Sequence, residues 1–179
     1  TPIASTIDLL LPTAPTTTTT VVAPGKTLSL SSTIKNQGNT AAGTFVAAFH
    51  LSVDNVYGGV DDIAFTATRS ITSLAAGASS TASTMLTVPA TTPLGNYYVC
   101  AMADSSLAVG ESDENNNTRC TATPIQITLP DLVMLDVTPT SPIADAGGNM
   151  TVNYAYQSML AMTVSSTDLR FYLSPDNNV

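Results

Sequence analysis

The chain has 179 residues, of which 44% are hydrophobic and 10% are charged, and it contains no tryptophan. Its five basic residues against 13 acidic ones give a formal net charge of −8. Nucleic acid and anionic membrane surfaces are bound through clustered Lys and Arg, so this composition argues against both as partners. No apolar run approaches the ~18 residues that span a bilayer, so no membrane insertion is expected in this segment.

Alternating apolar and polar residues predict a series of strands in the first 90 residues. A first strand is expected at residues 7–11, and the threonine run at 16–20 is either an edge strand or loop, or an O-glycosylated tract. Residues 28–34 and 45–53 alternate with a period of two, as half-buried strands do. Further strands are expected at 63–71 and 81–88, with turn signals between them and no helical period. This pattern predicts an antiparallel β-sandwich.

Residues 95–120 predict a hairpin with a long acidic, Asn-rich tip. The stretch around Tyr97 resembles the tyrosine corner of immunoglobulin-like folds. Cys100 follows Tyr97 by three positions, so it should face away from the core that holds Tyr97. Cys120, on the other arm, is its available partner. A Cys100–Cys120 disulfide would brace the tip and imply an oxidising compartment; two free buried thiols are the alternative.

The sequence begins to repeat after Pro130. Gly147-x-x-Met150-x-Val152 echoes Gly25-x-x-Leu28-x-Leu30, and residues 171–177 echo 49–55 at the same offset. This predicts a tandem array in which residues 1–129 form one β-sandwich and 130–179 form the N-terminal part of a second. The second unit has no counterpart of residues 61–120, so it is expected to be incomplete. Its missing strands would come from chain beyond Val179 or from strand addition by a neighbouring copy.

The segments KNQGNTAAGTF, FHLSVDN, SLAAGASS, PLGNYYVCAMAD and ESDENNNT, in this order, resemble CARDB, the cell-adhesion-related domain found in bacteria. The resemblance covers residues 6–128 fully and 130–179 in part. It implies an immunoglobulin-like sandwich of about seven strands, used as a tandem module in surface or secreted proteins of bacteria and archaea. The second unit carries Ser158-Met159-Leu160 where the first has Asn36-Gln37-Gly38, so its turn there is expected to differ.

Catalysis has little support in the sequence. A nucleophile needs a base held beside it, and His50 is the only histidine. It falls on a predicted strand with no second His, Cys or carboxylate at ligand spacing, so it is interpreted as an ordinary strand residue. No nucleophile elbow, phosphate loop or HExxH motif is present. We therefore expect no enzyme activity and no required cofactor.

The acidic loops raise the question of calcium, because Ca²⁺ binds carboxylate and amide oxygens. One candidate cluster comprises Asp54, Asn55, Asp61 and Asp62, and a weaker one comprises Asp104, Glu111, Asp113 and Glu114 in the hairpin tip. Neither has the spacing of an EF-hand loop. The alternative, which the sequence favours, is solvated loop charge that keeps a Thr-rich surface soluble. Asn116 and Asn149 match the glycosylation acceptor pattern, which matters only in a host that glycosylates.

The leading functional hypothesis is a non-enzymatic structural or adhesive module of an extracellular or cell-surface protein. It would act as a spacer or a protein-contact surface. One alternative is a self-assembling filament subunit completed by strand addition from a neighbour. Another is a carbohydrate-binding accessory module of a secreted hydrolase, against which the absence of tryptophan counts. The expected partners are therefore a protein or a second copy, with a glycan as the remaining candidate.

Overall fold

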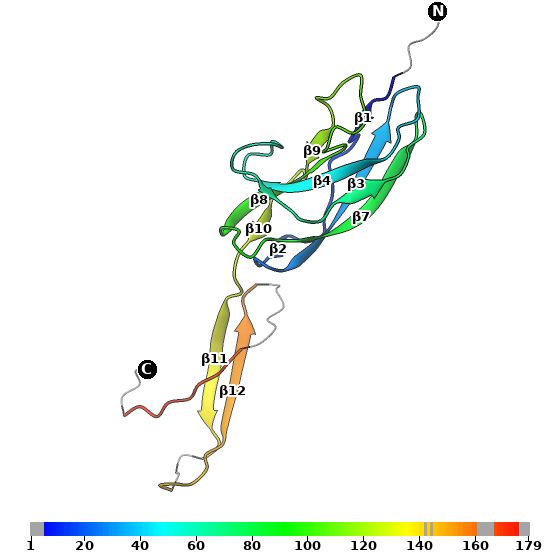
Figure 1. The fold of residues 1–179 in the computed structure, drawn as a ribbon. Helices are drawn as coiled ribbons and strands as arrows, with labels where there is room; N and C mark the ends of the chain where they lie inside the picture. The colour runs from blue at the N-terminus through cyan, green and yellow to red at the C-terminus, as the bar shows by residue number, and fades with distance from the viewer. Residues whose placement is uncertain (1–5, 142, 144, 161–166, 176–179) are drawn as a thin grey trace, which may run out of the picture. The chain divides into compact units, whose positions relative to one another are not determined.

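The computed structural model describes residues 6–141, 143, 145–160 and 167–175. The chain divides into two compact units, Thr1–Leu129 and Pro130–Val179 (Figure 1). Every regular element in the described residues is a strand. No helix in this part of the chain is long and apolar enough to cross a membrane.

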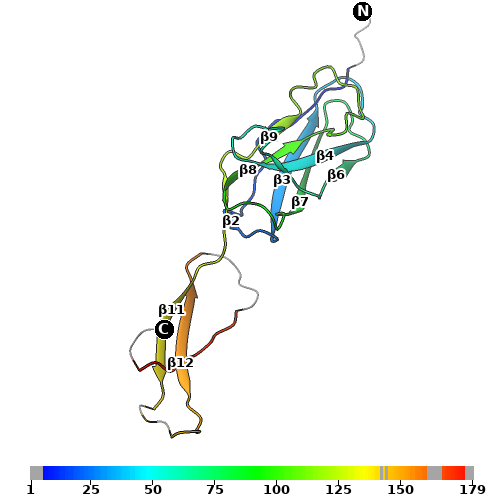
Figure 2. The ribbon, with the colours of Figure 1, turned by 60° about the vertical axis from the view of Figure 1, so that its left-hand side comes forward.

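Two sheets make up the first unit, and they face each other as a β-sandwich (Figures 1 and 2). One sheet has the order β1-β3-β7, with β1 at Leu9–Leu10, β3 at Thr27–Asn36 and β7 at Ser79–Thr87. The other has the order β2-β10-β8-β4-β5, formed by Val21–Val22, Ile125–Ile127, Gly95–Met102, Phe45–Ser52 and Ile63–Ala64. In addition, β6 (Arg69–Ile71) pairs with β4, and β9 (Thr118–Cys120) pairs with β8. The predicted all-β sandwich is confirmed, although β2 pairs with β10 in parallel.

The core lies between the two sheets and follows the period-two pattern of the sequence. Leu28, Leu30 and Ile34 of β3 are buried and point toward the second sheet. Phe45 and Phe49 of β4 are also fully buried and belong to the same cluster. Burial of each such side chain contributes about 1.5–3 kcal/mol, so this apolar layer is the main source of stability.

Two predicted strands differ from the observed ones: one ends earlier and the other is interrupted. Val53 was expected on the inner face of its strand, but β4 ends at Ser52 and Val53 is 51% exposed. The predicted strand at 63–71 is split into β5 and β6, which pair with opposite ends of β4. The segment between them contains more residues than the part of β4 that it spans. A continuous ladder is therefore impossible there, and the chain bulges away from β4.

The predicted tyrosine corner is present at the start of β8. The hydroxyl of Tyr97 donates a hydrogen bond to the backbone carbonyl of Pro93, at 3.1 Å. The Tyr97 ring is buried in the core cluster. This contact fixes the phase of β8, and the phase decides which way Val99 and Cys100 face.

The second unit contains one antiparallel hairpin, formed by β11 (Leu132–Pro139) and β12 (Val152–Ser158). At both ends its residue pairing matches the pairing of residues 9–16 with β3. The corresponding pairs are Leu9↔Asn36 with Leu132↔Ser158, and Thr16↔Ser31 with Thr138↔Asn153. The turns before β3 and β12 also correspond, because Gly25 (φ 78°) and Gly147 (φ 81°) share a left-handed conformation that favours glycine.

The turn after β12 was expected to differ from the one after β3. The first hydrogen bond of the two turns is nevertheless the same. Met159 N–H donates to the Asp131 carbonyl at 2.9 Å, and Gln37 N–H donates to the Asp8 carbonyl at 2.8 Å. Residues 171–173 echo β4 in sequence but form no strand. The last part of that echo, at 176–177, lies outside the described residues.

Candidate metal centre

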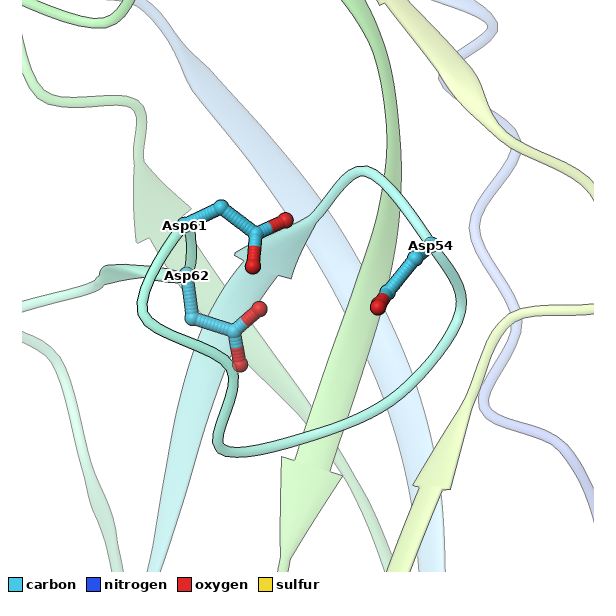
Figure 3. Close-up of side chains that lie close together, drawn as sticks. All are labelled: Asp54, Asp61 and Asp62. Carbon is cyan, nitrogen blue, oxygen red and sulfur yellow. The ribbon is translucent and has the colours of Figure 1, made fainter.

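The first predicted acidic cluster lies in the loop that joins β4 to β5. The pairs His50↔Ala64 and Leu51↔Ile63 hold the two ends of this loop together. Asp54 therefore leaves β4 opposite the point where Asp61 and Asp62 return to β5. One carboxylate oxygen from each of these three residues lies within 4.8 Å of the others, and their side chains turn toward one another across the loop (Figure 3). No other group of three or more His, Cys, Asp or Glu side chains is this compact in the described part of the chain.

Asp54 is positioned by the end of β4. Its Oδ1 accepts a hydrogen bond from Val56 N–H at 3.0 Å and lies 2.9 Å from the hydroxyl of buried Ser52. Asn55, another predicted ligand, has a φ of 65°. Asn tolerates this left-handed conformation better than most residues, so Asn55 has a backbone role in turning the loop.

Asp62 is the buried member of the cluster, with a side chain only 3% exposed. Its Oδ2 accepts a hydrogen bond from Gly58 N–H at 2.7 Å and lies 3.6 Å from Nδ1 of His50. Its Oδ1 is buried and has no hydrogen-bond partner. An unpartnered buried carboxylate oxygen is costly and calls for an explanation.

His50 lies in β4, as interpreted from the sequence, and the fold places this carboxylate beside it. Its ring stacks on Tyr57, with centroids 4.4 Å apart and planes 4° from parallel. Burial raises the pKa of Tyr57, and the nearby Asp62 raises it further. The β4–β5 register accounts for this arrangement, because Asp62 lies two positions before Ala64, the partner of His50, and is therefore the diagonal neighbour of His50 on the same face.

Positive charge near the cluster is sparse. Among the described residues, the contact of His50 with Asp62 is the single approach of a basic side chain to a carboxylate within 4.0 Å, and it is an ion pair only when the imidazole is protonated. Three carboxylates this close repel one another. A bound cation would relieve that repulsion.

The second predicted cluster, in the hairpin tip, is dispersed among hydrogen bonds. Buried Asp104 accepts from Ala108 N–H at 2.9 Å and Val109 N–H at 2.8 Å. The carboxylates of Asp113 and Glu114 accept from backbone N–H groups of the same tip. These side chains stabilise the turn, and the structure does not assemble them into a ligand set.

Glu111 ties the tip to the first strand. Its carboxylate accepts hydrogen bonds from Leu9 N–H and, at 2.9 Å, from the side-chain amide of Asn117. Burial raises the pKa of Glu111 to about 7; the bonds from Leu9 and Asn117 oppose the shift, while Glu114 and Asp104 add to it. The role of this residue is therefore structural.

The two glycosylation acceptors differ in accessibility. The side-chain amide of Asn116 donates to Asp8 Oδ1 at 2.9 Å, so it already joins the tip to the N-terminal segment. Asn149, in the second unit, is exposed. Of the two, Asn149 is the better placed for modification.

The predicted disulfide joins Cys100 and Cys120, which lie directly opposite each other in β8 and β9. Both side chains lie outside the central core cluster, as the phase of β8 predicts. Facing away from that core does not expose these side chains, because Cys100 is 0% exposed and Cys120 is also buried. β8 is an interior strand, with β4 on one side and β9 on the other, so its outward side chains are covered by neighbouring strands and loops.

These features define a β-sandwich module braced by one disulfide and carrying a compact acidic loop. The CARDB family model matches residues 6–121, and the chain belongs to the CARDB family. No curated protein matches the sequence.

Solved structures similar to this chain include two archaeal domains and one enzyme. A CARDB domain from Pyrococcus furiosus, crystallised in complex with di-metal ions, is 18% identical (TM-score 0.49; 69% of this chain and 90% of that chain covered). A domain from Methanosarcina acetivorans, from a protein proposed to lie at the cell surface, is 24% identical (TM-score 0.47; 69% and 93%). A β-glucosidase from Erythrobacter marinus is 13% identical (TM-score 0.42; 69% and 16%).

Proposed function

We propose that this chain is a non-enzymatic module of an extracellular or cell-surface protein, where it acts as a spacer and a protein-contact surface. The observation that carries the proposal is the buried Cys100–Cys120 disulfide. Structural disulfides persist in oxidising compartments and are rare in the cytosol. Membership in the CARDB family supports the same location.

The chemistry of the described residues supports a structural role. His50 stacks on Tyr57, and its buried Nδ1 receives no hydrogen bond from a hydroxyl or thiol. Both cysteines are consumed by the disulfide. Covalent catalysis requires a nucleophile with a base beside it, and these side chains do not form such a pair.

The outer face of β3 and β7 suits a contact surface. Its cross-strand pairs include Ser31↔Ser83 and Thr33↔Thr81, and the hydroxyls of the second pair are hydrogen-bonded at 2.8 Å. The exposed side chains of β7 on this face, including Ser83, are all uncharged. All of them except Met85 are also short. Short side chains lose little conformational entropy on binding, so this face can be covered at low cost.

Two measurements test this function. Antibodies raised against the chain should label intact cells of the producing organism, and protease treatment without lysis should remove the signal. Beads coated with the chain should also attach to those cells. Ser83→Arg should weaken attachment, whereas Ala76→Arg in an exposed turn should not. Signal that appears only after lysis would contradict the location, and equal attachment of the two variants would contradict the assignment of the surface.

Self-association is a second candidate function, favoured by the apolar face of the second hairpin. One face of β11–β12 is formed by Leu132, Met134, Val137 and Pro139 together with Val152, Tyr154 and Tyr156. By the shared register, Val152 of β12 corresponds to Leu30 of β3. Leu30 is fully buried, whereas Val152 is only half-buried. On the same face Tyr154 contacts the ring of Phe171, with centroids 5.5 Å apart, and is still 48% exposed. We infer that a second copy covers this face, since two such faces can pack as the sheets of a sandwich do.

Analytical ultracentrifugation of the full chain tests this second candidate. The wild-type chain should form dimers or larger species as its concentration rises. Tyr154→Ser with Tyr156→Ser should remain monomeric. Gln157→Ser, on the opposite face of β12, should behave as the wild type. A wild-type chain that stays monomeric at the highest concentration would contradict the inference.

A further inference from the structure

We propose that the β4–β5 loop is a calcium site in which Asp54, Asp61 and Asp62 supply the protein carboxylates. One carboxylate oxygen of each residue lies within 4.8 Å of the others, and the side chains turn toward the space enclosed by the loop (Figure 3). Ca²⁺ is bound by sets of oxygen ligands, with carboxylates commonly supplemented by backbone carbonyls and water. Asp54 and Asp61 are exposed, so water can complete such a set from the solvent side.

The state of Asp62 is a second, independent indication of a ligand. Only 3% of its side chain is exposed, yet its Oδ1 has no hydrogen-bond partner. The other oxygen is held by Gly58 N–H. The carboxylate is therefore fixed by one oxygen and offers the other, which is the arrangement that a metal ligand needs.

The donor set favours calcium over other cations. Zinc sites in proteins are built mainly on thiolate and imidazole donors, with carboxylates as additional ligands, but both cysteines are in the disulfide and His50 does not belong to the compact group. Mg²⁺ demands near-ideal octahedral geometry, whereas Ca²⁺ accepts flexible coordination. The loop changes direction at Asn55 and Gly58, which both have positive φ values, and such an irregular loop fits the less demanding ion.

Binding at this position would join the two ends of the loop. Asp54 follows β4, while Asp62 immediately precedes β5. An ion held by both would cross-link the hairpin at its neck and hold Tyr57 against His50. Because the unfolded chain lacks this assembled site, Ca²⁺ should raise the melting temperature in a concentration-dependent way.

Terbium luminescence and thermal unfolding test the proposal on the full chain. Tb³⁺ replaces Ca²⁺ at oxygen sites, and Tyr57, which lies in the same loop and is affected by the charge of Asp62, can sensitise its emission. The wild-type chain should show this emission, lose it on addition of excess Ca²⁺, and melt at a higher temperature in Ca²⁺ than in EDTA. Tyr57→Phe should lose most of the emission but keep the Ca²⁺-dependent shift in melting temperature.

Matched carboxylate variants locate the site. Asp61→Asn, at an exposed position, should weaken Tb³⁺ and Ca²⁺ binding by about tenfold or more while leaving the melting temperature in EDTA unchanged or higher. Asp113→Asn in the hairpin tip should bind as the wild type does. The proposal is overturned if millimolar Ca²⁺ leaves the wild-type melting temperature unchanged, or if Asp113→Asn weakens binding as much as Asp61→Asn.

Discussion

The carboxylate of Glu111 accepts a hydrogen bond from the backbone N–H of Leu9, which joins the tip of the β8–β9 hairpin to the first strand. The next residue repeats the link, because Ser112 N–H donates to the Ile7 carbonyl at 2.8 Å. Arg119 adds a third tie, from its guanidinium to the Pro12 carbonyl at 3.0 Å. The hairpin tip therefore anchors the beginning of the sandwich.

Glu111 should make the first unit less stable as the pH rises toward neutrality. Burial raises the pKa of this carboxyl from its ordinary 4.5 to about 7. The folded state then holds the proton more tightly than the unfolded state. The stabilisation is complete below the unfolded pKa and is lost as the pH rises through the folded pKa. The urea midpoint should fall across this window.

Glu111→Gln should flatten that decline, because the amide keeps an oxygen for Leu9 N–H and does not ionise. Asp136→Asn, on exposed β11, serves as the control and should retain the wild-type slope. Urea midpoints measured between the two pKa values check this. A Glu111→Gln variant with the same slope as the wild type would assign the pH dependence to other groups.

Replacing both cysteines by alanine should lower the free energy of unfolding by about 3 kcal/mol, the loop-closure estimate for a disulfide of this span. The bonded residues are 20 positions apart. Guanidinium unfolding of the variant and of the reduced wild-type chain, which keeps both side chains, separates loop closure from lost packing. A loss near zero in the reduced chain would show that β8 and β9 need no covalent brace.

Gly38→Ala should be destabilising because backbone atoms occupy the space that a side chain would need. A Cβ at this position would lie 2.3 Å from the carbonyl oxygen of Thr6 and 2.9 Å from Cα of Ile7. Overpacking of this kind costs about 1–3 kcal/mol. Gly43 has no neighbour within 4 Å of such a Cβ, so Gly43→Ala should change the free energy of unfolding by no more than about 0.5 kcal/mol. Similar denaturant midpoints for the two variants would contradict this packing.

Tyr97→Phe removes one hydrogen bond from the tyrosine corner while keeping the buried ring. The loss should be about 1 kcal/mol, since the Pro93 carbonyl loses its donor. Tyr98→Phe, on the neighbouring half-buried residue, is the matched control and should have a smaller effect. Thermal unfolding of the two variants gives the comparison. Equal stability would show that the hydrogen bond from Tyr97 to Pro93 does not stabilise β8.

Much of the sandwich could be predicted because its inner faces follow the period of a strand. Leu28, Leu30 and Ile34 alternate with polar residues, and this alternation locates β3. The choice of neighbouring strands within a sheet leaves no comparable pattern in the sequence. The parallel contact of β2 with β10 and the break between β5 and β6 depend on how the strands align across the sheet, and that alignment is set by the packing of the whole unit.

The same limit applies to the site. Loop composition is enough to identify Asp54, Asp61 and Asp62 as candidates. The burial of Asp62 and the approach of His50 follow from the β4–β5 register, which the sequence pattern does not specify. For Cys100, the spacing from Tyr97 gives the correct face of β8. Its burial depends on the strands that flank β8 on both sides.

The redox state of the cysteines at the surface of intact producing cells tests the extracellular assignment most directly. Trypsin cleaves after Arg69, Arg119 and Arg170, so Cys100 and Cys120 fall in different peptides. Mass spectrometry of surface-released material, digested without reduction, should find these two peptides linked. Free cysteines that react with an alkylating agent, or peptides recovered only after lysis, would contradict a disulfide-braced module outside the cell.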